Sequence, residues 1–305
     1  MTETHPGDPV APEPASFTVA PSGYRLPAAL RLGAVRLQVS DLARSIGFYE
    51  RVLGLHVTER DETGATLAAR DHETPLIDLI ELRGAVPVPR RGRLGLYHFA
   101  LLLPDRASLG RLVTHLGALG VRPGSADHLV SEALYLTDPD GLGIEVYADR
   151  PRSTWRMQGP ALAMATVPLD LDDLVRAACG RPWTGAPPGT RMGHVHLHVG
   201  DLEVAGAFYH GGLGLDRIVL NFAGALFMSA GGYHHHLGTN TWARGVPKAT
   251  EGDARLLEWT IQLPDTSDVE AAARSLIASG HPVGRDSGGA VVQDPWGTNL
   301  RLTVR

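Results

Sequence analysis

The chain has 305 residues, of which 43% are apolar and 20% are charged, and it carries a formal net charge of −5. This length suits two domains of ordinary size, and the composition predicts a packed globular protein. No block of lysine and arginine suggests nucleic-acid binding, and no apolar run approaches the roughly 18 residues of a membrane span.

The first 30 residues are acidic and rich in proline, and we expect them to form a flexible tail. They lack the basic start and the apolar stretch of a signal peptide. The chain contains one cysteine, Cys179, so no internal disulfide can form. Both features favour a reducing, cytoplasmic location.

The first predicted elements are a strand and a helix. The segment VRLQV (35–39) alternates as a half-buried strand does. The segment Ser40-Asp41-Leu42 offers N-cap chemistry for a helix that carries Ile46, Phe48, Tyr49 and Leu53, and Gly54 is suited to end it. Short alternating strands follow at 64–70 and 75–82.

The same plan then recurs along the chain. A strand (99–103) precedes Pro104-Asp105, a helix through Leu109 and Leu116, and strands at 133–138 and 143–147. Residues 32–55 align with 192–215, and residues 96–120 align with 256–280, both at an offset of 160. The segment DPDGLGIEVY (138–147) matches DPWGTNLRLT (294–303) at an offset of 156. This periodicity indicates a tandem duplication.

The repeat predicts an α+β fold of four βαβββ modules, at about 31–95, 96–150, 191–255 and 256–305. We expect modules one and two to form an N-terminal half-barrel domain (31–150), and modules three and four a C-terminal one (191–305). Residues 151–190, with a short helix-like stretch at 171–180, are predicted to connect the two domains.

The first strand GHVxLxVxDL, the helix with FY and LGL, and the DPxGxxxEV segment together resemble the vicinal oxygen chelate superfamily. That superfamily includes glyoxalase I, extradiol catechol dioxygenases, fosfomycin-resistance enzymes and bleomycin-binding proteins. The four modules, with GGYHHHLGTNTW in the third, look most like catechol 2,3-dioxygenase. The resemblance covers both halves of the chain and implies a metal site on the inward face of a cupped sheet.

The resemblance places a metal ligand at His194 in the first strand of the third module. His196 and His198 share that strand face, and we expect them to serve as polar or hydrogen-bonding residues. Three adjacent histidines, His234, His235 and His236, interrupt an apolar segment, which is costly unless they are paired or bound to metal. Neighbouring strand residues face opposite sides, so either His235 alone or His234 with His236 points inward.

The C-terminal half departs from the family pattern at two ligand columns. Glu258 stands where His98 stands in the N-terminal half, and Arg301 stands where Glu145 stands. One interpretation is a permuted metal site of His194, His236 and Glu258, with His235 and His234 as acid–base residues. The alternative is an ion pair between Glu258 and Arg301 in place of the metal. We favour the permuted site because it gives the histidine run a purpose.

The N-terminal half has His98, Glu145 and Glu81 but carries Ala34 at the first-strand ligand column. One ligand is therefore absent, and we expect this half to be structural rather than metal-binding.

The resemblance implies an Fe(II)-dependent extradiol dioxygenase, with Mn, Zn and Ni as alternative metals. The substrate is then a catechol-type aromatic compound, cleaved with O₂. Five aromatic residues are candidates to wall its ring, although core packing is the more common use of each: Phe222, Phe227, Trp242, Trp259 and Trp296. The alternatives are a glyoxalase-type metal-dependent lyase or isomerase, and a non-catalytic binder of small molecules. We expect no nucleic-acid or membrane partner, and a homo-oligomer is left open.

Overall fold

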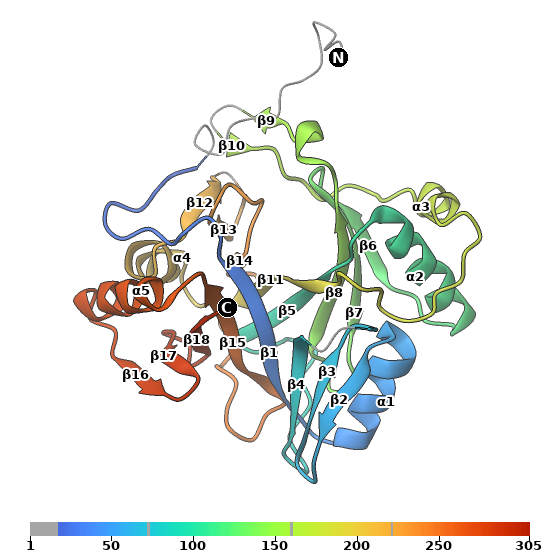
Figure 1. Ribbon diagram of the computed structural model, residues 1–305, viewed down its shortest axis with the longest axis horizontal. Coiled ribbons are helices and arrows are strands. Elements are labelled where there is room, and N and C mark those ends of the chain that lie inside the picture. Colours follow the sequence, from blue (N-terminus) through green and yellow to red (C-terminus); the bar gives the residue numbers. More distant parts are fainter. Residues whose placement is uncertain (1–17, 72–73, 159–160, 221) are drawn as a thin grey trace, which may run out of the picture.

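The computed structural model describes residues 18–71, 74–158, 161–220 and 222–305. It contains two eight-stranded mixed sheets with helices packed outside them, α1, α2 and α3 on one side of the molecule and α4 and α5 on the other (Figure 1). The predicted α+β fold of four βαβββ modules is confirmed. Within the described residues, no helix is both long and apolar enough to cross a membrane.

One sheet, which we call the 2–3 sheet, is built from the second and third modules. Its strands, in spatial order, are β12 (Asp216–Val219), β13 (Ala225–Ser229), β14 (Leu237–Asn240), β11 (Arg191–His198), β5 (Gly95–Leu102), β8 (Gly143–Asp149), β7 (Ser131–Thr137) and β6 (Gly124–Asp127).

The other sheet, which we call the 1–4 sheet, is built from the first and fourth modules. Its strands, in spatial order, are β16 (Val283–Asp286), β17 (Gly289–Gln293), β18 (Asn299–Val304), β15 (Arg255–Leu263), β1 (Arg31–Val39), β4 (Pro75–Glu81), β3 (Gly64–Ala68) and β2 (His56–Arg60).

This arrangement corrects the expected pairing of modules. We expected modules one and two to share a sheet, but β1 pairs antiparallel with β15, and β11 pairs antiparallel with β5. Each sheet therefore takes one module from each half of the sequence. An antiparallel pair of first strands can form between any two modules, and the repeat alone does not select the partner.

The helices and turns keep modules of the same half in contact. Tyr49 on α1 (Leu42–Leu53) donates a hydrogen bond to Asp138, in the DPxG turn of the second module, at 3.2 Å. Tyr209 donates in the same way to Asp294 of the fourth module at 2.8 Å. Both aspartates also accept backbone N–H groups of their own turn. The tyrosine of each FY motif thus forms the same hydrogen bond with the aspartate of a DPxG motif in both halves of the chain.

Helix starts follow the predicted capping chemistry. Asp41 accepts a hydrogen bond from the Arg44 N–H, and Gly54 ends α1 with a φ of 67°. Aspartates also cap α2 (Arg106–Ala118), α4 (Leu202–Ala205) and α5 (Thr266–Ala278). In the third module the helix continues as a π-helix (Gly206–Gly212), in a segment with three glycines.

The connector contains a 3₁₀ turn (Arg152–Thr154), the two-residue strands β9 (Met157–Gln158) and β10 (Ala161–Leu162), and α3 (Leu171–Ala177), as its helix-like stretch predicted. It contacts both halves of the chain: β10 lies against β12, and α3 packs against α2. Cys179 is exposed.

Candidate metal centre

Three side chains of the 2–3 sheet converge at its centre: His98 from β5, Glu145 from β8 and His194 from β11. Their placement follows from strand register. β5 and β11 are antiparallel neighbours, and β8 lies on the other side of β5 with Ala100 opposite Glu145. Alternate residues of a strand face the same side, so His98 and Glu145 share a face with His194.

The three donor atoms lie close together in a buried environment. The distances are 3.3 Å between the Nε2 atoms of His98 and His194, 3.0 Å from His98 Nε2 to Glu145 Oε2, and 3.2 Å from His194 Nε2 to the same oxygen. Ligands that bind one ion at about 2.1 Å lie roughly 3.0 to 3.4 Å apart in octahedral or tetrahedral geometry. The donor set therefore fits a divalent metal ion.

The protonation states also suit metal binding. Burial, the largest influence, lowers the pKa of both His98 and His194, so both imidazoles are neutral at neutral pH. Burial opposes ionisation of Glu145, but the two histidines hold the pKa of this carboxyl well below its usual range. Two neutral imidazoles and one carboxylate are a common ligand set for divalent transition metals.

The three ligands come from β5, β8 and β11, and the corresponding position of β14 carries no ligand. His196 pairs with Gly238 across β11 and β14, as Ala100 pairs with Glu145 across β5 and β8. Gly238 thus occupies the place in β14 that Glu145 occupies in β8. A Cβ at Gly238 would lie 2.8 Å from Cγ of His196, so the imidazole of His196 fills the space where a side chain would project.

The permuted ligand set predicted from the sequence is not assembled. His194 is in the cluster, but Glu258 lies on β15 in the other sheet, where it accepts hydrogen bonds from Arg301 at 2.7 and 3.2 Å. The ion pair that we had considered as the alternative is therefore the one observed. Glu81, the further N-terminal candidate, instead pairs with Arg83 at 2.9 Å and accepts from the Leu42 N–H.

The three adjacent histidines divide between two environments. The His235 ring lies 4.0 Å from that of His194 and lines a pocket beside the cluster. His236 lines a separate cavity with Arg191 and Arg152. His234 is buried between the two and bonds to Asp149 through Nε2 at 3.0 Å.

His234 and His235 form a hydrogen-bonded chain toward the cluster. The Asp149 carboxylate accepts a hydrogen bond from His234 Nε2, and a hydrogen bond of 2.7 Å joins Nδ1 of His234 to Nδ1 of His235; with the neutral tautomer of His234 that carries its hydrogen on Nε2, His235 is the donor. This leaves the Nε2 of His235 as a free base in the pocket. Burial and the neighbouring histidines hold the pKa of His235 well below its usual value, so this base is neutral.

His196 and His198 are hydrogen-bonding residues, as we had expected. His196 Nε2 accepts from the Asn240 side-chain amide at 2.9 Å, and His198 Nδ1 donates to the Asn240 oxygen at 2.7 Å. Both imidazoles are thereby fixed in orientation.

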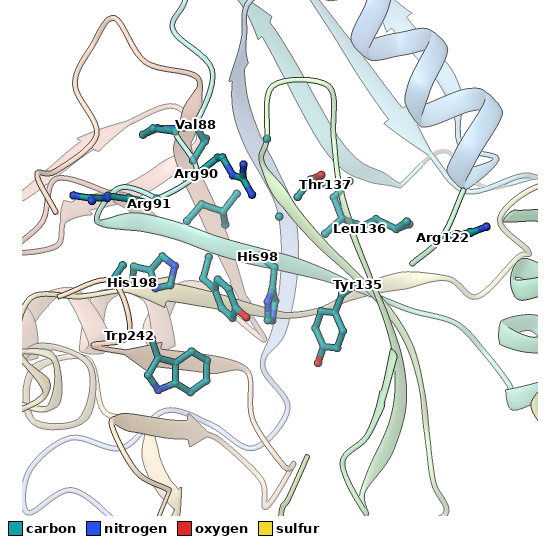
Figure 2. Close-up of a pocket in the computed structure, with 18 of the residues that line it drawn as sticks. Val88, Arg90, Arg91, His98, Arg122, Tyr135, Leu136, Thr137, His198 and Trp242 are labelled. Carbon is teal, nitrogen blue, oxygen red and sulfur yellow. The ribbon is translucent and has the colours of Figure 1, made fainter. Parts of the chain in front are cut away.

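Two adjoining pockets open onto the cluster. The inner one, about 270 Å³, is lined by His98, Glu145, His235 and the aromatic rings of Tyr97, Tyr135, Phe222, Phe227 and Trp242. The outer one, about 770 Å³, shares Tyr97, His98, Tyr135 and Trp242 with it (Figure 2). Three of the five predicted wall residues are therefore in place, whereas Trp259 and Trp296 are buried in the core.

Two site residues were missed from the sequence, Tyr135 and His128. Tyr135 lies opposite Glu145 in the antiparallel pair of β7 and β8, and its hydroxyl donates to His128 Nε2 at 2.6 Å. His128 is held through Nδ1 by the Ala165 carbonyl at 2.8 Å. The pairing of ALYLTD with GIEVY as a hairpin was the available signal for Tyr135.

Comparison with known proteins agrees with this fold. Residues 31–146 match the Glyoxalase/Bleomycin resistance protein/Dioxygenase superfamily. The chain is 43% identical over 268 residues to a catechol-2,3-dioxygenase of Bacillus subtilis, which covers 87% of this chain and 93% of that protein. The chain therefore belongs to this superfamily, and the resemblance to catechol 2,3-dioxygenase is confirmed.

Solved structures show the same fold at low identity. A putative dioxygenase from Bacillus subtilis superposes with a TM-score of 0.63 at 16% identity, covering 92% of this chain and 86% of that one. A glyoxalase I mutant from Zea mays superposes with a TM-score of 0.55 at 19% identity, covering 90% and 92%.

Proposed function

We propose that this protein is an Fe(II)-dependent extradiol dioxygenase that cleaves a catechol-type aromatic ring with O₂. The observation that carries the proposal is the cluster of His98, His194 and Glu145 with Gly238 at the fourth position. Two histidines and one carboxylate that leave further coordination positions open are typical of non-heme Fe(II) oxygenases. The catechol-2,3-dioxygenase relative supports the same assignment.

Residues around the cluster suit the binding of an aromatic diol. When bound, Fe(II) would lower the pKa of a coordinated hydroxyl and provide a place for O₂. Phe227 and Trp242 provide apolar walls for a ring, and both line the inner pocket with His98. Tyr135, hydrogen-bonded to His128, presents a hydroxyl group near Glu145.

His235 is the residue best placed to move a proton. Its ring lines the inner pocket beside that of His194, and its Nδ1 is engaged by the hydrogen-bonded chain of His234 and Asp149, which leaves Nε2 available as a base. A base positioned in this way can accept a hydroxyl proton of the substrate and return it to a later oxygen anion. His234 acts through His235 and is assigned a positioning role.

The outer pocket suggests the type of ring substituent. Arg90, Arg91 and Arg122 line it, and no aspartate or glutamate of the described ranges does. Figure 2 shows the guanidinium of Arg90 directed into the pocket and that of Arg91 directed away from it. We propose that catechols with an anionic substituent are favoured over neutral ones.

The test is anaerobic loading of metal-free protein with Fe(II), followed by a set of catechols and O₂. We expect O₂ uptake and a yellow ring-cleavage product. Parallel samples loaded with Mn, Zn or Ni distinguish this reaction from a lyase or isomerase reaction, which does not consume O₂. Absence of O₂ uptake and product with all of the catechols would contradict the proposal.

A further inference from the structure

A second cavity lies where the two sheets meet, away from the inner and outer pockets. Its volume is about 350 Å³, and its lining includes the first residues of β1 and β11 and the segment between β13 and β14. β1 and β11 contact each other directly. None of the proposed metal ligands lines this cavity.

Four arginines surround this cavity: Arg31, Arg152, Arg191 and Arg305. No aspartate or glutamate that the structure describes is among the lining residues, although the chain as a whole carries a net charge of −5. Within the described part of the chain, none of the four guanidinium groups forms an ion pair with a carboxylate. Arg305 donates to the Ala29 carbonyl at 2.7 Å and Arg152 to the Gly231 carbonyl at 3.4 Å.

Two of the four arginines occupy equivalent positions in the two halves of the duplicated sequence. Arg31 and Arg191 are 160 residues apart, and each is the first residue of the first strand of its module. The contact between β1 and β11 brings these equivalent positions to one cavity. Like charges gathered in this way repel one another unless an anion or solvent compensates them.

His236 adds a neutral donor to the same cavity. Its Nδ1 accepts the Ala230 N–H at 3.3 Å, so the ring hydrogen resides on Nε2. Burial, followed by His234, His194, Arg152 and Arg191, lowers the pKa of His236 to about 3, which places both arginine charges near the ring. His236 thus stays neutral at physiological pH and can donate one hydrogen bond through Nε2.

We infer that this cavity is a binding site for a small anion with two negative charges, of the phosphate or dicarboxylate type. Guanidinium groups donate paired N–H groups to the oxygens of either anion, and His236 Nε2 supplies a further donor. The occupied site contacts the segment 230–236, which also carries His234 and His235. Anion binding is therefore expected to stabilise this segment.

The test is calorimetric titration of the full chain with inorganic phosphate and, separately, with succinate, at an ionic strength fixed with sodium chloride. We expect saturable binding of one anion per chain and a rise in Tm with anion concentration. The two titrations distinguish a phosphate site from a carboxylate site, and saturable binding of either anion at this cavity supports the inference.

Three variants locate the binding. The double variant Arg31→Gln/Arg191→Gln, at two exposed positions, is expected to weaken the affinity at least tenfold. In His236→Asn the new amide oxygen can still accept the Ala230 N–H, but the Nε2 donor is lost, so a smaller loss is expected. The matched control Arg181→Gln removes an exposed arginine of the connector and should leave the affinity unchanged.

Arg90→Gln separates this site from the outer pocket and should also bind the anion with unchanged affinity. The inference is overturned if the wild-type chain shows no saturable binding of either anion. It is equally overturned if the double variant binds as tightly as the wild type, or if Arg90→Gln abolishes the binding.

Discussion

The two sheets of this protein have the same topology but different chemistry at equivalent positions. The 2–3 sheet presents His194, His98 and Glu145 on β11, β5 and β8. The 1–4 sheet carries Ala34, Glu258 and Arg301 on β1, β15 and β18. The register is the same in both, because Arg301 pairs with Thr260 as Glu145 pairs with Ala100.

The difference shows that equivalent positions can serve metal binding in one sheet and an ion pair in the other. Arg301 binds both Glu258 and Asp286, so the position equivalent to Glu145 carries a paired cation in place of a carboxylate ligand. The pocket on the 1–4 sheet, about 340 Å³, mixes Arg36 and Arg60 with Glu59, Asp61 and Asp78. Among the described residues that line the outer pocket of the 2–3 sheet there are three arginines and no aspartate or glutamate.

The largest effect is expected from removal of a ligand in the 2–3 sheet. His194→Ala and Glu145→Gln should lose bound metal, and ring cleavage should fall at least about 10³-fold. Glu258→Gln, the matched change in the 1–4 sheet, should keep the metal content of the wild type. Metal analysis of the three purified variants checks this, and loss of metal in Glu258→Gln would break the comparison.

The next effect concerns the base beside the cluster. His235→Asn retains a side-chain group that can bond to His234 but removes the Nε2 base, so kcat should fall roughly 10²-fold while metal content is retained. Loss of the fall in kcat at acidic pH distinguishes this proton-accepting role from a structural one, which would leave the pH dependence of kcat unchanged. The control is His115→Asn, which changes a histidine of α2 that lines neither pocket and should alter kcat only slightly. An unchanged kcat in His235→Asn would refute the assignment.

In the 1–4 sheet we expect a substitution to lower the stability of the protein without lowering its metal content. Arg301→Met leaves the largely buried Glu258 carboxylate unpaired, which should lower the free energy of unfolding by about 1–3 kcal/mol. Denaturant titration measures the change, and metal content should be unaltered. Arg285→Met breaks the more exposed pair with Glu270 and should cost less than about 0.5 kcal/mol. Equal losses in the two variants would contradict this explanation.

The two sheets should also respond differently to acid. His98, His194, His196, His235 and His236 of the 2–3 sheet all have a lowered pKa, whereas no histidine is buried among the described residues of the 1–4 sheet.

The unfolded chain therefore binds more protons than the folded chain once the pH falls below about 6.5, and stability decreases as the pH falls further. In metal-free protein, the free energy of unfolding should depend less steeply on pH after His236→Asn. We expect the slope of this free energy against pH, between pH 6 and pH 4, to fall by up to about 1.4 kcal/mol per pH unit. Urea titrations at several pH values measure the slope, and a slope equal to that of the wild type would exclude a buried neutral His236.

The smallest effect is expected at the mouth of the outer pocket. Arg90→Gln should lower kcat/KM for a carboxylate-bearing catechol about fivefold relative to unsubstituted catechol, because one screened charge interaction is lost. Arg91→Gln is the matched control, because the guanidinium of Arg91 points away from the pocket. If the two variants show the same ratio of kcat/KM values, Arg90 does not select the substrate.

The sequence predicted the modules because they depend on local patterns. Alternating strands, the aspartate caps at Asp41 and Asp105, and the left-handed Gly54 are set by neighbouring residues, and the structure contains them as expected. His194 was predicted as a ligand for the same reason, since it stands at a fixed place in a recognisable first strand.

Only the tertiary structure decided which modules share a sheet, and hence which ligands meet. His98 and Glu145 were assigned to an incomplete N-terminal site because their partner, His194, lies in the other half of the sequence, 96 residues after His98 and 49 residues after Glu145. The antiparallel contact of β5 with β11 completes that site, and the contact of β1 with β15 leaves Glu258 beside Arg301. Strand periodicity determines which face a side chain takes, but only packing between distant segments determines its neighbours.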